Sequence, residues 1–290
     1  MSDAGLRTRL LNLPRSLLKG RWIEERLFPL VRGRDPETSL AARMIPNHYQ
    51  YATGSIRRVR REGFEWELDI SDMMDWYLYW GLFEPSLEGF LSRLEPGQTV
   101  VDVGANNGRW SLRSSKRVGA DGSVHAIEPF PANADRCLRN LELNEVTNVR
   151  HHAVAFGRER GTIRMSRHLE HNLGTARVSS GEGDGALVEV VTVDEWHERE
   201  GIGPVHVIKI DVEGYEEAVL TGAEATLSRW RPWLFVEVGD ANLRGQGSSA
   251  KRLIARLEQL GYQCEGAEDG RSVASSHDLN DCHFDVIALP

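Results

Sequence analysis

The residues best suited to chemistry follow a short apolar run at 99–103. Asp102 lies inside this run, and Gly104, Asn106 and Gly108 follow it. This order predicts a buried strand that turns tightly into a helix, whose first N–H groups are unpaired and carry a partial positive charge. Glycine would also let a ligand approach the main chain. We therefore expect a nucleotide-like ligand at this turn. Asp102 replaces the first glycine of G-x-G-x-x-G, which disfavours an NAD-dependent oxidoreductase.

A second candidate binding residue is Glu128, which ends the next apolar run about 20 residues after the glycine turn. In a βαβ nucleotide site, an acidic side chain at this point accepts hydrogen bonds from both ribose hydroxyls. A strand-end glutamate on its own is more often a helix cap or a surface ion-pair partner. Its spacing from the glycine turn favours the ribose role.

Three charged residues, Lys209, Asp211 and Glu213, alternate with apolar residues further along the chain. On an extended strand they share one face. Burying them without partners would be costly, so we expect either mutual pairing or a ligand. A purely structural Lys–Asp pair is the alternative.

Asp211 is the first candidate for a general base, and Lys209 could orient it or hold the acceptor of the reaction. His171, in the polar loop 167–185, is a second candidate base, although a loop histidine is more often an exposed bystander. Asp211 and Glu237 could also hold Mg²⁺, because strand-end carboxylates suit that ion.

The elements that must position these residues alternate between strand and helix patterns from residue 98 onward. Predicted strands are 99–103, 123–128, 148–155, 204–211, 232–238, 261–265 and 282–289, with hairpin-like segments at 160–166 and 186–193. Predicted helices are 108–118, 131–143, 213–229 and 248–260. This pattern indicates a doubly wound α/β sheet with its ligand at the carboxyl ends of the strands.

The N-terminal part of the chain follows a different pattern. Residues 6–30 combine leucines at helical spacing with arginines, which predicts an amphipathic helix that packs on its own domain or on a second copy in a homodimer. Weak peripheral binding to a membrane surface is the alternative for this segment. Residues 47–70 resemble a hairpin, and the aromatic-rich segment 71–95 looks helical.

The composition excludes several classes of protein. The net charge of −8 argues against a nucleic-acid partner, and no apolar run reaches the roughly 18 residues of a membrane span. Cys137, Cys264 and Cys282 are odd in number and lack C-x-x-C spacing, which argues against a disulfide framework or a structural zinc. We therefore expect a cytoplasmic protein.

Several long motifs occur in the order and spacing of a known family. They read VVDVGANNGRWS, VHAIEPFPANADRCLRNLELN, HAVAFGRERGTIRM, VTVDEW and VIKIDVEGYEEAVLTGAEATLSRWRPWLFVEV. From about residue 84 onward the chain resembles the FkbM-type class I methyltransferases that depend on S-adenosylmethionine (SAM). The resemblance implies a Rossmann-like sheet of seven strands with the last strand antiparallel. It would place the methyltransferase domain at 84–290. The helical and hairpin extension at 1–83 matches no motif of the family, and we expect it to serve as a cap or dimer contact.

The resemblance also assigns roles to residues. Asp102, Gly104, Asn106 and Gly108 match the turn that binds the methionine part of SAM, Glu128 matches the ribose ligand, and Ala153 would flank adenine. Many SAM enzymes have an acidic residue near this last point, whereas this chain has His151 and His152.

The implied activity is O-methylation of a sugar, glycolipid or polyketide-type natural product. The alternatives are a SAM-binding protein without catalysis, or a methyltransferase for a nitrogen or carboxylate acceptor. A nucleic-acid methyltransferase is disfavoured, since no Asn-Pro-Pro-Tyr-like motif occurs.

Overall fold

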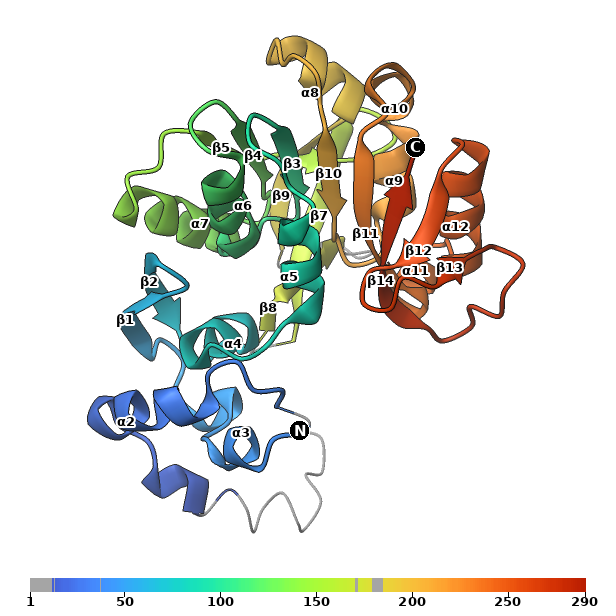
Figure 1. Ribbon diagram of the computed structural model, residues 1–290. Helices are drawn as coiled ribbons and strands as arrows, with labels where there is room; N and C mark the ends of the chain where they lie inside the picture. Colours follow the sequence, from blue (N-terminus) through green and yellow to red (C-terminus); the bar gives the residue numbers. More distant parts are fainter. Residues whose placement is uncertain (1–11, 13, 37, 170–171, 179–184) are drawn as a thin grey trace. The chain divides into compact units, whose positions relative to one another are not determined.

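The computed structural model describes residues 12, 14–36, 38–169, 172–178 and 185–290. The chain divides into two compact units (Figure 1). One unit comprises residues 1–84 with 169–174, and the other comprises 85–168 with 175–290. In the part of the chain that the structure describes, no helix has the length and apolar character needed to cross a membrane.

The first unit contains a hairpin and short helices. Strands β1 (Ile56–Arg61) and β2 (Phe64–Asp69) pair antiparallel, so the hairpin predicted within 47–70 is confirmed. Every second residue of β2 is buried, including Trp66 and Leu68. The helical elements are α2 (Arg21–Val31), α3 (Leu40–Met44), η1 (His48–Gln50) and α4 (Met73–Trp80).

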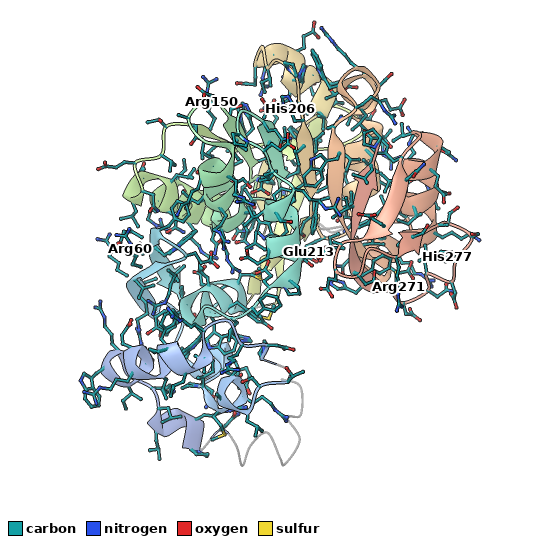
Figure 2. The ribbon with its side chains drawn as sticks, in the orientation of Figure 1. Arg60, Arg150, His206, Glu213, Arg271 and His277 are labelled. Carbon is teal, nitrogen blue, oxygen red and sulfur yellow. The ribbon has the colours of Figure 1, made fainter. Side chains whose placement is uncertain are left out.

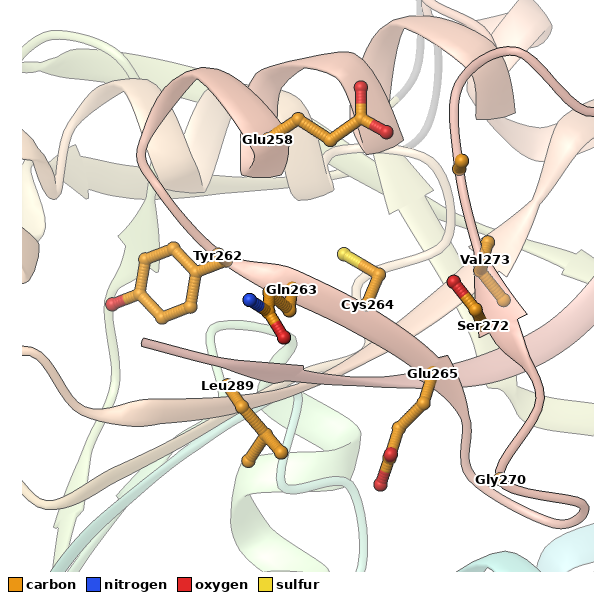
Figure 3. Close-up of a pocket in the computed structure, with 10 residues that line it drawn as sticks. Glu258, Tyr262, Gln263, Cys264, Glu265, Gly270, Ser272, Val273 and Leu289 are labelled. Atoms are coloured by element: carbon orange, nitrogen blue, oxygen red, sulfur yellow. The ribbon is translucent and has the colours of Figure 1, made fainter.

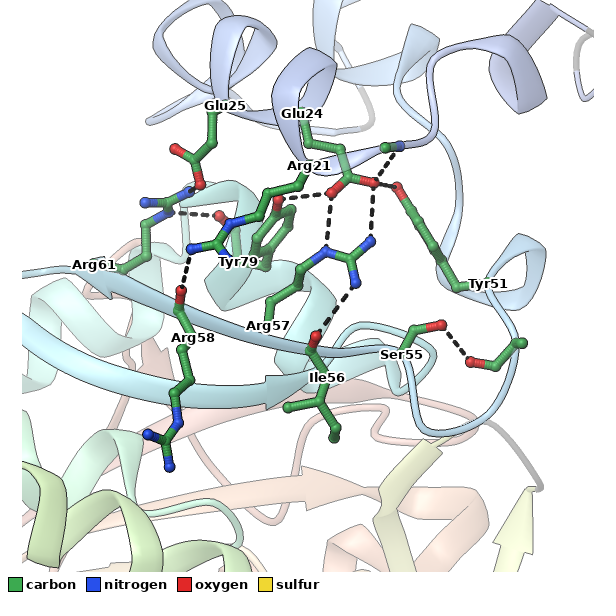
Figure 4. Close-up of polar contacts among 12 residues, drawn as sticks. Arg21, Glu24, Glu25, Tyr51, Ser55, Ile56, Arg57, Arg58, Arg61 and Tyr79 are labelled. Carbon is green, nitrogen blue, oxygen red and sulfur yellow. Dashed lines mark hydrogen bonds and ion pairs between the residues drawn. The ribbon is translucent and has the colours of Figure 1, made fainter.

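A buried carboxylate holds this unit together. Glu24 of α2 is fully buried and accepts hydrogen bonds from the hydroxyls of Tyr51 and Tyr79, at 3.0 and 2.8 Å (Figure 4). It also accepts from the Gly20 N–H and pairs with Arg57 at 3.1 Å. Burial would raise the pKa of Glu24, but its hydrogen bonds to Arg57, Gly20 and Tyr79 lower it overall. The carboxylate is therefore charged and fully paired.

The second unit is built on a sheet of eight strands in the order β13-β12-β14-β11-β10-β3-β4-β5. Their bounds are β3 Thr99–Val103, β4 Ser123–Ile127, β5 Val149–His152, β10 Val207–Ile210, β11 Trp233–Gly239, β12 Gln263–Gly266, β13 Ser272–Val273 and β14 His283–Leu289. The α/β class and the antiparallel last strand are confirmed, since β14 runs antiparallel to β11 and β12. The predicted count of seven omits β13, a two-residue edge strand too short to show a pattern.

Alternate residues of the central strands face two separate cores. Val101 and Ile208 pack with helix residues such as Val219 and Leu253, whereas Val100 and Val207 pack with a second group that includes Phe90. The sheet is therefore covered on both faces, as a doubly wound fold requires. The helices of this unit are α5 Pro85–Ser92, α6 Arg109–Val118, α7 Pro131–Leu143, α8 Val193–Arg199, α9 Glu216–Thr221, α10 Glu224–Trp230, α11 Asp240–Gly245 and α12 Ala250–Gln259.

Three predicted elements need correction. The strand predicted at 148–155 is two strands, because β5 joins the large sheet and β6 (Ala155–Phe156) joins a second sheet. The polar loop predicted at 167–185 lies partly in strands β7 (Gly161–Leu169) and β8 (Asn172–Val178), which with β6 and β9 (Ala186–Val191) form that second sheet. The helix predicted at 213–229 is interrupted at Gly222, where a Cβ would lie 2.0 Å from the Gly157 carbonyl oxygen.

Candidate active site

The glycine turn follows β3 at the carboxyl edge of the large sheet. Gly104 has φ 86°, and a Cβ there would lie 1.9 Å from the carbonyl oxygen of Asp211. Gly108 has φ 84°, and its Cβ would lie 3.0 Å from Cys137 Sγ. We expected glycine at 104 so that a ligand could approach the main chain. The structure gives a different reason, since the space beside Gly104 is filled by the chain leaving β10.

Lys209 holds the glycine turn and the end of β10 together. It lies opposite Asp102 in the parallel pairing of β10 and β3. Its Nζ donates to the Gly104 carbonyl at 2.9 Å and lies 3.3 Å from a carboxylate oxygen of both Asp102 and Asp211. Burial alone would lower the pKa of Lys209, but Asp211 and Asp102 outweigh it and raise that pKa. Lys209 is therefore held in its charged form beside Asp211, which suits orienting that carboxylate; its role in holding the acceptor stays a prediction.

Asp102 and Asp211 differ in exposure. The Asp102 side chain is almost fully buried, and its Oδ2 accepts from Ser111 Oγ at 2.6 Å. The Asp211 side chain is 40% exposed. The two carboxylates share one lysine, but only Asp211 is open to a ligand.

Glu128 lies just beyond β4, next to the glycine turn. Its Oε2 accepts from the Asn106 N–H at 2.8 Å, and its Oε1 accepts from the Phe130 N–H at 2.9 Å. Burial raises its pKa to about 7, although the two backbone hydrogen bonds oppose this. Each carboxylate oxygen keeps a second lone pair, so Glu128 can still accept two further hydrogen bonds.

Two buried polar atoms close to Glu128 have no hydrogen-bond partner among the described residues: Asn106 Oδ1 and His151 Nε2. Burial lowers the pKa of His151, and a backbone hydrogen bond with Glu128 only partly opposes it. Buried polar atoms without partners are rare in folded proteins. These two atoms fit hydrogen bonds to a bound molecule. Ala153, expected to flank that molecule, is exposed after the end of β5.

A group of acidic side chains lies at the carboxyl ends of β10 and β11. Burial and the charges of Asp211, Glu213, Glu216 and Asp285 raise the pKa of Glu237 well above its ordinary value. Asp285 lies opposite Glu237 in the β11–β14 pairing, and burial raises its pKa to about 6. His283 Nε2 lies 3.4 Å from Glu237 Oε1. Figure 2 shows Glu213 beyond the carboxyl end of β10, at the opposite end from His206.

Sequence reasoning missed Asp285 and His283. Both depend on the antiparallel register of β14, which no local pattern of charges reveals.

The prediction that Asp211 and Glu237 hold Mg²⁺ gains no support, because no three His, Cys, Asp or Glu side chains among the described residues are arranged to hold a metal ion. His171, the second candidate base, lies outside the described residues.

A small apolar pocket adjoins the glycine turn. It is lined by residues from the ends of three strands of the large sheet and from the second sheet, including Gly104, Pro129, Val154, Met165 and Tyr215. A more polar pocket lies at the opposite edge of the large sheet, around β12 and β13 (Figure 3). None of the candidate site residues lines it, whereas the apolar pocket is lined by Gly104 of the glycine turn.

Comparison with known proteins identifies the family. The family described as "Methyltransferase FkbM domain" matches residues 102–264, more than half of the chain. The 2-O-methyltransferase NoeI of Sinorhizobium fredii is 25% identical over 167 residues, which is 51% of this chain and 66% of that protein. Methyltransferase 1 of Beauveria bassiana is 27% identical over 184 residues, which is 56% of this chain and 71% of that protein.

A solved structure of a methyltransferase FkbM from Methylobacillus flagellatus shares 16% identity, with a TM-score of 0.43, over 74% of this chain and 54% of its own. The chain spans about two thirds of the length of the 2-O-methyltransferase NoeI. The family match covers the glycine turn, Glu128 and the strand that carries Lys209. The chain belongs to the FkbM methyltransferase family.

Proposed function

We propose that this methyltransferase transfers the SAM methyl group to a hydroxyl of a sugar, glycolipid or polyketide-type natural product. The observation that carries the proposal is the position of a half-exposed carboxylate, Asp211, on the same carboxyl edge as Glu128 and the glycine turn. The relative named as a 2-O-methyltransferase supports a hydroxyl acceptor. The excess of acidic residues, 31 against 22 basic ones in residues 85–290, favours a small acceptor over a nucleic acid.

Residues near Glu128 would hold the donor. Glu128 would accept hydrogen bonds from the ribose hydroxyls, and Asn106 with the turn from Gly104 to Gly108 would bind the methionine part. Asp102 is buried under the turn, so it would act by fixing Lys209 rather than by touching the ligand. Ala153 would flank adenine, as the sequence predicts.

His151 would recognise adenine in place of the acidic residue that the sequence lacks. Because Nε2 has no partner, the backbone hydrogen bond with Glu128 must engage Nδ1. In the neutral ring Nε2 then carries the lone pair and can accept from the adenine amino group. His151→Phe keeps a planar aromatic ring at this position but removes this acceptor. We expect SAM to bind about tenfold more weakly, whereas the exposed His277→Phe control should bind as the wild type does.

SAM supplies a methyl group that is already electrophilic, so the chain must align the acceptor and remove its proton. Alignment can contribute effective molarities of about 10⁵ M or more, and a general base about 10²–10⁴-fold. Asp211 is the proposed base, oriented by Lys209. His171 stays a second candidate from the sequence.

The direct test is transfer of radiolabelled methyl from SAM to a panel of hydroxyl, amine and carboxylate compounds. We expect label in sugar, glycolipid or polyketide-type hydroxyls, and Asp211→Asn should lower kcat by about 10²-fold with an unchanged dissociation constant for SAM. The exposed Asp269→Asn change serves as the control. Label only in amines or carboxylates would overturn the acceptor class. SAM binding without transfer to any compound would favour a non-catalytic binding protein.

The remaining expectations for the whole protein are also proposals. Cys137, Cys264 and Cys282 are all free thiols in the structure, which supports a cytoplasmic location. A homodimer through the N-terminal unit stays a prediction. Sedimentation of the full chain over a range of concentrations would test it.

A further inference from the structure

Helix α2 presents large apolar side chains to solvent. Trp22 is 67% exposed and Leu30 is 61% exposed, and both lie on the side of the helix opposite Glu24 and Val31. Leu17, shortly before the helix, is 78% exposed. We call Trp22, Arg26 and Leu30, which share one side of the helix, the outer face of α2; the exposed Arg21 and Arg32 flank it. An exposed tryptophan beside exposed leucines marks an interaction site more often than an isolated apolar residue does.

The orientation of α2 is fixed by its buried side. Glu24 is held by Tyr51, Tyr79, Arg57 and the Gly20 N–H, as Figure 4 shows. Rotating the helix to bury Trp22 would expose this carboxylate and break all of these hydrogen bonds. The outer face is therefore a fixed feature of the fold.

The outer face is also basic. The Arg26 guanidinium on this face lies 3.8 Å from the centre of the Trp22 ring, and the flanking Arg21 and Arg32 are also exposed. The exposed acidic residue of this helix, Glu25, is paired with Arg61 at 3.2 Å. Residues 14–34 contain six Lys or Arg and two Asp or Glu, although the whole chain carries −8.

These features fit one kind of partner. Tryptophan and arginine side chains suit the boundary between lipid headgroups and acyl chains, and basic residues are attracted to anionic lipids. A second copy that docked through the same face would bring a second set of basic side chains to an already basic surface, with no unpaired acidic residue on α2 to neutralise it. We propose that the outer face of α2 binds the surface of an anionic lipid bilayer.

Flotation of the full chain with lipid vesicles tests this proposal. Vesicles of phosphatidylcholine alone are compared with vesicles that contain about one third phosphatidylglycerol, at low and high salt. We expect clear binding only to the anionic vesicles, weakened by salt. Trp22→Ser with Leu30→Ser should reduce binding at least fivefold, and each of Arg21→Gln, Arg26→Gln and Arg32→Gln should reduce it up to about fivefold.

Matched controls come from exposed residues of the other unit. Leu187 is 65% exposed, and the Arg271 side chain is 87% exposed. Leu187→Ser and Arg271→Gln should bind vesicles as the wild type does, and every variant should keep the wild-type circular dichroism spectrum. No binding to anionic vesicles, or equal binding by wild type and Trp22→Ser/Leu30→Ser, would overturn the proposal. So would a dimer in solution that this double variant dissociates, because the face would then belong to a second copy.

Discussion

Glu128 is buried and has two backbone donors, yet its pKa lies near neutrality at about 7. Ribose hydroxyls donate to the charged carboxylate, so binding of SAM requires the deprotonated form. We predict that the dissociation constant of SAM is constant above pH 7 and rises toward tenfold per pH unit below it. Calorimetry from pH 5.5 to 8.5 measures this. The same profile in Glu128→Gln would show that another group is responsible.

Lys209 joins the two strands that carry the site. It contacts Asp102, Asp211 and the Gly104 carbonyl, and it is almost fully buried. Lys209→Met leaves the buried Asp102 without its cation, so we predict a loss of about 3–5 kcal/mol in the free energy of unfolding. Urea denaturation measures this loss. The exposed Lys116→Met control should change stability by less than about 0.5 kcal/mol. If Lys209→Met lowered the free energy of unfolding by less than about 1 kcal/mol, Lys209 would not be holding the two strands together.

At the scale of elements, the glycine turn is fixed by the close approach of β3 and the segment after β10. Gly97 and Gly104 allow a matched comparison, because their φ angles are 83° and 86° while nothing lies near a Cβ at Gly97. We predict that Gly97→Ala costs about 1 kcal/mol of unfolding free energy and Gly104→Ala at least about 2 kcal/mol more. Equal costs, measured by thermal denaturation, would mean that backbone strain alone explains Gly104.

The meeting of the glycine turn and Glu128 could be predicted because each of its signals is local. A buried strand, a glycine turn and a strand-end carboxylate each occupy a few consecutive residues, as around Asp102 and Glu128. The reason for Gly104 could not be predicted, since the Asp211 carbonyl that excludes a side chain comes from a strand a hundred residues away.

The acidic group at the carboxyl ends of β10 and β11 depends on how strands distant in the sequence pair. Asp285 meets Glu237 only because β14 runs antiparallel beside β11. Likewise, the predicted helix 213–229 is interrupted at Gly222, where the carbonyl of the distant Gly157 leaves no room for a side chain. Periodicity along one segment carries no information about such contacts, so these features need the structure.

At the scale of the whole molecule, the free energy of unfolding should depend on pH through buried glutamates and a buried histidine, which have opposite effects. Burial raises the pKa of Glu128 and Glu216 to about 7, so the folded state binds more protons than the unfolded state between about pH 4.5 and 7. Their stabilisation is present at low pH and is lost as the pH rises through 7. His125 acts oppositely, because burial lowers its pKa to about 4 and stability falls as the pH drops below 6.5.

Between pH 5.5 and 8 the two glutamates outweigh the histidine. We predict that the ligand-free protein has a lower melting temperature at pH 8 than at pH 5.5, and that Glu216→Gln reduces this difference. Differential scanning calorimetry measures both. A higher melting temperature at pH 8 would show that these carboxyl groups are not buried as the structure has them.

We predict that SAM binds at the carboxyl ends of β3 and β4, with Glu128 as the residue that holds the ribose. Titration calorimetry with S-adenosylhomocysteine tests it without knowledge of the acceptor. The wild type should bind one molecule per chain, the exposed Glu258→Gln control should match it, and Glu128→Gln should bind at least about tenfold more weakly. Wild-type affinity in Glu128→Gln, or no binding by the wild type, would contradict the account.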